Sequence, residues 1–155
     1  MERFSLELTL TVTEGSIHNL GHLRCLAWIC ASTYNPLHQD RGKAVVLSQT
    51  ADLAGPFAAK ELEISTIILA ELVKLMKHLD LPDRTPDVHA KGGNPSAWQS
   101  IVLDLFLNGR QGRISLALLA GGLEGKDADL MHRLLSQLFT LLDVPFLQPW
   151  ISIDG

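Results

Sequence analysis

Residues Phe4–Val12 read FSLELTLTV, and apolar side chains alternate with polar ones through the whole segment. Because successive side chains of a β-strand point to opposite faces, this alternation predicts a strand with one buried face. The apolar residues on that face are Phe4, Leu6, Leu8, Leu10 and Val12. Such a strand needs a second layer to cover it, so we expect a sheet packed against helices.

Two other segments show the 3–4 spacing of an amphipathic helix. Residues 17–33 follow Ser16, a suitable N-cap, and place apolar side chains on a common face. The segment after Asp127 repeats the pattern, and Asp127 is itself a suitable cap. The leucines of this second helix are Leu130, Leu134, Leu135, Leu138 and Leu142. Both segments are therefore predicted to be helices.

Residues 57–79 leave two alternatives open. One is a continuous helix, and the other is a short strand at residues 61–64 followed by a helix capped by Ser65. The regular leucine spacing in the second half of the segment favours the mostly helical alternative.

Apolar runs between turn residues predict further strands. These runs are residues 43–48, 101–107, 113–119 and 150–153. Asn108 and Gly109 stand between two of them and predict a hairpin with a five-residue loop. The polar segment 83–96 is rich in proline and glycine and is expected to be a mobile loop.

The predicted architecture is a single α+β domain over residues 1–155. It is a two-layer sandwich with a mixed sheet of four to six strands and about three helices, in the order β-α-β-α-β-β-α-β. Residues 3–22 partly resemble residues 113–132, and this echo suggests a pseudo-repeat in which each half is strand, glycine turn and helix. If all helices lie on one side of the sheet, something else must cover its other face.

Charge and composition exclude several classes of protein. The net charge is −4 and the basic residues are scattered, so no nucleic-acid partner is expected. No apolar run is long enough for a membrane span, and no signal-peptide core begins the chain. Two cysteines, Cys25 and Cys30, without a targeting signal favour a cytoplasmic protein.

Catalytic and cofactor motifs are incomplete. The glycine turn at residues 120–127 follows a predicted strand, but Asp127 stands where a phosphate loop needs a hydroxyl, so no nucleotide or other cofactor is expected. The prediction on enzymatic activity leans towards none. An alternative is a small enzyme or small-molecule binder with a pocket near the glycine turns and the 83–96 loop. Its candidate residues are Gly15, Gly121, Gly122, His89 and Asp104.

Metal binding is a further alternative. His18, His22 and Cys25 would share one face of the first predicted helix, and imidazole and thiolate are good zinc ligands. A complete site needs more ligands than these, so boundary histidines beside a core thiol are the favoured interpretation.

The leading functional hypothesis is a non-catalytic protein-interaction module. Hydrophobic residues make up 46% of the chain and charged residues only 19%, which leaves an apolar surplus for a partner to cover. We expect a homo-oligomer or a subunit of a complex, with the role of an adaptor, chaperone or neutralising partner of bacterial type. The candidate partner-binding residues are Trp28, Trp98, Phe139 and Trp150.

Overall fold

A computed structural model describes most of the chain. The described residues are 3–16, 19–33, 41–49, 57–90, 97–118 and 123–143. Their elements are, in order, β1 (Ser5–Ser16), β2 (Asn19–Ser32), β3 (Arg41–Gln49), β4 (Phe57–Ser65), α1 (Thr66–His78), β5 (His89–Ala90), β6 (Ala97–Leu107), β7 (Arg110–Leu118), β8 (Leu123–Glu124) and α2 (Ala128–Leu142).

Six strands form the main sheet, in the spatial order β4-β3-β2-β1-β6-β7. Every neighbouring pair in it is antiparallel. The short strands β5 and β8 pair separately. The predicted α+β class is confirmed, whereas the predicted mixed sheet is wrong. Meander connections join β1 to β4 in turn and β6 to β7, while the connection from β4 through α1 crosses the sheet and places β6 beside β1, with which it is antiparallel.

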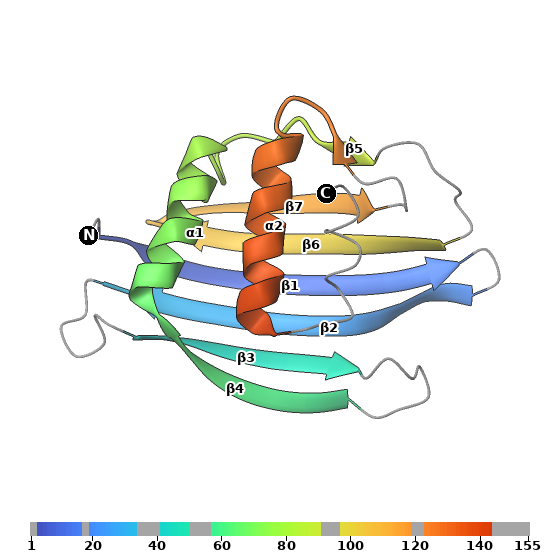
Figure 1. Ribbon diagram of the computed structural model, residues 1–155, viewed down its shortest axis with the longest axis horizontal. Helices are drawn as coiled ribbons and strands as arrows, with labels where there is room; N and C mark the ends of the chain where they lie inside the picture. Colours follow the sequence, from blue (N-terminus) through green and yellow to red (C-terminus); the bar gives the residue numbers. More distant parts are fainter. Residues whose placement is uncertain are drawn as a thin grey trace.

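The helices form the second layer. Both α1 and α2 lie across the same face of the main sheet (Figure 1). The inward apolar side chains of β1 are at most 2% exposed, as the alternation from Phe4 to Val12 predicts. Within the described residues, neither helix is long and apolar enough to cross a membrane.

The helix predicted over residues 17–33 is wrong, because the described part of this segment is strand β2. Cys25, Ala27, Ile29 and Ala31 are buried against the helices, which is a strand period of two. The outward positions between them also carry apolar residues, including Trp28, and these hide the alternation. Ladder pairing with β1 and β3 outweighs the helix propensity of such residues.

The segment 57–79 adopts the alternative that the leucine spacing disfavours. Its first part is β4, paired with β3 along its whole length, and only its second part is the helix α1. Ser65 caps that helix, since its Oγ accepts a hydrogen bond of 3.2 Å from the backbone N–H of Ile67. The mostly helical prediction therefore fails because pairing with β3 overrides the propensity of residues 58–63.

The hairpin between β6 and β7 is tighter than predicted. Its loop is Asn108-Gly109, with φ angles of 51° and 84°, rather than five residues. Positive φ at both positions is the geometry that matches the twist of a two-residue hairpin. The Asn108 Oδ1 also accepts a hydrogen bond of 2.9 Å from the backbone N–H of Ser5.

The helix count and the order of elements also differ from the prediction. Two helices are present in the described residues rather than about three, and four strands precede the first helix. In the echo of residues 3–22 and 113–132, only the second half leads into a helix. The predicted strand at residues 150–153 lies outside the described residues.

A cluster of hydrogen bonds and an ion pair, which we call the Asp127 cluster, joins the start of α2 to the first half of the predicted 83–96 loop. Residues 91–96 of that loop lie outside the described residues. The Asp127 carboxylate accepts a hydrogen bond of 2.8 Å from the backbone N–H of Asp87, and it pairs with Arg84 at 2.9 Å. Asp127 is the N-cap residue of α2, as predicted, but its side chain makes no cap hydrogen bond. It holds the preceding loop instead.

Gly125 lies beside the Asp127 cluster, against the backbone of Asp87. Its φ is 125°, and a Cβ there would lie 2.3 Å from the backbone oxygen of Asp87. Gly109 also has a positive φ, but a Cβ there meets open space.

We expect Gly125→Ala to destabilise the fold more than Gly109→Ala. The first substitution adds a backbone clash to the strain of positive φ, for a loss of about 3 kcal/mol, against about 1 kcal/mol for the second. Urea unfolding of both variants measures the difference. Equal losses would show that Gly125 does not approach Asp87 as described.

From the Asp127 cluster we also expect the stability of the fold to depend on pH. The hydrogen bond from Asp87, followed by the pairing with Arg84, holds the pKa of Asp127 below its usual value. The stabilisation is therefore present above about pH 4 and is lost as the pH falls through the lowered pKa. Asp127→Asn should be less stable than the wild type at pH 7, and the difference should shrink as the pH falls towards 2, as urea unfolding measures.

Asp129→Asn is the matched control, because Asp129 is exposed in the first turn of the same helix. A stability difference for Asp127→Asn that does not change between pH 7 and pH 2 would contradict the role of the carboxylate charge.

Candidate functional site

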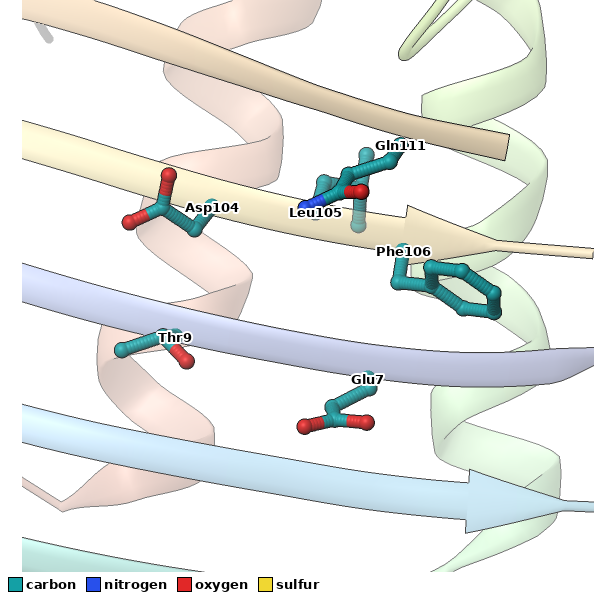
Figure 2. Close-up of a pocket in the computed structure, with 6 residues that line it drawn as sticks. All are labelled: Glu7, Thr9, Asp104, Leu105, Phe106 and Gln111. Carbon is teal, nitrogen blue, oxygen red and sulfur yellow. The ribbon is translucent and has the colours of Figure 1, made fainter. Parts of the chain in front are cut away.

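The main sheet has a second face that the helices do not cover, which we call the open face. Figure 2 is drawn from this side, and α1 and α2 lie behind the strands. Four large apolar side chains on it are 37–42% exposed. They are Leu26, Trp28, Val45 and Phe106. The solvent-facing side of an antiparallel sheet commonly carries polar residues, whereas this face also carries large apolar ones.

The strand register gathers most of these side chains on β2 and β3. Trp28 is paired with Val45, and Leu26 is paired with Leu47, which is half-buried. Directly paired side chains on one face lie about 5 Å apart, so one continuous patch is formed by Leu26, Trp28, Val45 and Leu47. We call it the apolar patch.

Glu7 links the apolar patch to the aromatic ring on β6. The indole N–H of Trp28 donates a hydrogen bond of 3.1 Å to the Glu7 carboxylate. On its other side, Glu7 is paired with Phe106. The hydrogen bond thus orients the Trp28 ring, while the side chain remains partly exposed.

A shallow hollow of about 150 Å³ lies beside Glu7, across β1, β6 and β7 (Figure 2). Its lining residues are Glu7, Thr9, Asp104, Leu105, Phe106 and Gln111. Asp104 is held by Arg113, whose Nε donates to the carboxylate at 2.6 Å. The same hydrogen bond raises the pKa of Arg113. Because its carboxylate already accepts this charged donor, Asp104 is poorly placed to act as a base.

A second polar cluster lies on the helix-facing side of the sheet. The Gln99 amide donates a hydrogen bond of 3.0 Å to Glu14, and the Arg24 guanidinium lies 3.3 Å from the other Glu14 oxygen. Gln99 and Arg24 are both buried. The Glu14 carboxylate balances the charge of Arg24, while the Gln99 Oε1 has no hydrogen-bond partner among the described residues.

The structure describes the side chains of two predicted partner-binding residues, Trp28 and Phe139, and one of them lies on the open face. Trp28 is there, while Phe139 belongs to α2 and is fully buried in the core. Trp98 belongs to β6, where it pairs with Gly15 of β1, and its side chain is not described. Trp150 lies outside the described residues.

The predicted ligand-binding residues do not form one group in the described part of the chain. Asp104 lines the hollow on the open face. His89 belongs to the small β5–β8 sheet, where its Nε2 lies 3.1 Å from the Glu124 carboxylate. Gly121 and Gly122 lie outside the described residues.

The metal hypothesis loses the helix on which it depended. His22 and Cys25 lie on strand β2, and His18 lies outside the described residues. Cys25 is fully buried, and burial raises the pKa of its thiol to about 11. Across the ranges that the structure describes, no three His, Cys, Asp or Glu side chains form a group suited to a metal ion.

Leu26, Val45, Phe106 and Glu7 are surface residues that sequence reasoning missed. A signal for them exists, because each occupies the outward position of a strand that alternates regularly on its inward side. For Leu26, that signal is readable only once residues 19–32 are recognised as a strand.

Comparison with known proteins finds no relative of this chain. No protein-family model matches the chain, and no curated protein matches it. The open face is therefore the main guide to function.

The two thiols should differ in reactivity. A pKa of about 11 in place of 9.0 lowers the thiolate fraction of Cys25 about 100-fold at pH 8, and burial blocks access as well. We expect a disulfide reagent to modify Cys30, which is half-buried, in the native protein and Cys25 only after unfolding. Rapid modification of the native Cys30→Ser variant would contradict the burial of Cys25.

Proposed function

We propose that this chain is a non-catalytic protein-interaction module that binds a protein partner through its open face. One observation carries the proposal. Trp28, Leu26 and Val45 lie side by side and exposed on the face of the sheet opposite α1 and α2. The roles that fit such a module are adaptor, chaperone or neutralising partner.

The chemistry of the open face supports protein binding. Tryptophan is enriched among the residues that dominate binding energy, and a well-packed apolar centre with a polar rim is typical of interfaces. Here the apolar patch is bordered by Lys43, Glu61 and Glu63, which project from β3 and β4. Burying the patch would remove apolar area from water at a gain of about 25 cal/mol per Å².

Small-molecule binding and catalysis have weaker support. The hollow of about 150 Å³ is smaller than the roughly 300–1,000 Å³ of typical ligand pockets. The two groups nearest to catalytic chemistry are Asp104, which is paired with Arg113, and Cys25, whose raised pKa keeps the thiol protonated at neutral pH. A binding surface therefore fits these residues better than an active site.

The proposal is tested by replacing the centre of the apolar patch. Trp28→Thr retains a strand-forming residue but removes the large ring, so it should weaken association at least about 30-fold, the loss expected for a tryptophan hot spot. Native mass spectrometry of untagged protein from its own cells reports the assembly, and titration of the components measures its affinity.

Ile67→Thr is the matched control, because Ile67 is 70% exposed but lies on α1, away from the open face. Ile67→Thr should leave the assembly intact. The proposal fails if Trp28→Thr, shown to be folded by thermal unfolding, assembles as tightly as the control.

A further inference from the structure

We infer that the partner of the open face is a second copy of this chain, docked face to face about a twofold axis that runs parallel to the strands between β1 and β2. This inference rests on the proposed function and specifies its partner. It places β2 over β1 of the second copy, β3 over β6, and β4 over β7, because the axis reverses the strand order.

The size of the open face fits a stable dimer. Six strands spaced about 4.8 Å apart give a width of about 29 Å, and strands of nine residues are about 30 Å long. The face is therefore about 870 Å² before side-chain relief is counted. A standard protein interface takes about 800 Å² from each partner.

The distribution of charge selects the orientation of the axis. Outward side chains on β4 are acidic at Glu61 and Glu63, while the other edge strand, β7, presents Arg113. The strand register places Glu61 and Arg113 in the same row across the sheet. A twofold axis parallel to the strands brings Glu61 of each copy over Arg113 of the other.

The inner strands carry no such charge pair. Lys43 shares its row with Phe106 and would lie over Phe106 of the second copy, while Asp104 shares its row with Val45. The charge contact that selects the axis is therefore that of the edge strands, Glu61 with Arg113. A twofold axis perpendicular to the strands would instead place β4 over β4, with glutamates facing glutamates, which is unfavourable.

The apolar patch gains cover in this arrangement. Trp28 on β2 would lie over β1 of the second copy, near Thr9 in the same row. Facing sheets pack about 10 Å apart, a gap that a tryptophan ring can fill. The two indole rings, one from each copy, would then form the centre of the interface, from which water is excluded. The pairs of Glu61 with Arg113 would lie at its rim.

A mixing experiment tests this orientation. In Glu61→Lys, the introduced ammonium group of each copy would lie over Arg113 of the other. In Arg113→Glu, the introduced carboxylate of each copy would lie over Glu61 of the other. Each variant alone should therefore dimerise on the order of 100-fold more weakly than the wild type. An equimolar mixture should restore dimerisation, because both contacts of the mixed pair join opposite charges.

Sedimentation velocity from about 1 to 100 µM measures all of these states. Restoration in the mixture also shows that both variants are folded. Should either variant fail to fold, Gln111→Glu tests the next outward row, because its carboxylate would lie over Glu63 of the second copy. It should weaken dimerisation, and mixing it with Glu63→Lys should restore dimerisation.

Three outcomes overturn the inference. They are a wild type that stays monomeric up to about 100 µM, a dimer indifferent to the single charge reversals, and weakened variants that mixing does not restore. Failure here is distinguishable from failure of the proposed function. A monomer that loses a different protein partner on Trp28→Thr retains the interaction module and rejects only the second copy as its partner.

Discussion

The antiparallel pairing of β1 with both β2 and β6 is the contact on which the rest of the structure depends. It places the alternating side chains of Phe4–Val12 at the centre of the sheet, with every apolar one turned to the helices. Since the pleat has a period of two, this register also fixes which side chains of the neighbouring strands turn the other way. Trp28 and Phe106 are exposed for this reason.

The same constraint explains how a chain with a high apolar content divides its surplus. Inward positions of β2 hold Cys25, Ala27 and Ala31, small side chains that allow the helices to approach closely. Its outward positions hold Leu26 and Trp28, which no helix covers. The apolar residues therefore serve two faces, and in the part of the chain that the structure describes the helices cover one of them.

Sequence reasoning recovers the elements whose patterns are local. The alternation of β1 and the leucine spacing of α2 predict these two elements correctly, because each has one apolar face and one polar face. Strands β2 and β4 are not predicted correctly. Both faces of β2 are apolar, so no alternation marks it as a strand. Residues 58–63 of β4 have helix-forming propensity, which only pairing with β3 overrides. The sequence predicts Trp28 as a surface residue, but its neighbours Val45 and Phe106 come from other strands, and their proximity depends on register.

Hydroxyl-radical footprinting tests most directly whether association buries the open face. The protein is oxidised at concentrations below and above assembly, and mass spectrometry reads each residue. We predict that oxidation of Trp28 and Phe106 falls on assembly, while Ile67 and Ile68, exposed on the helical side, stay equally reactive. Protection of Ile67 and Ile68 with unchanged Trp28 and Phe106 would contradict this account.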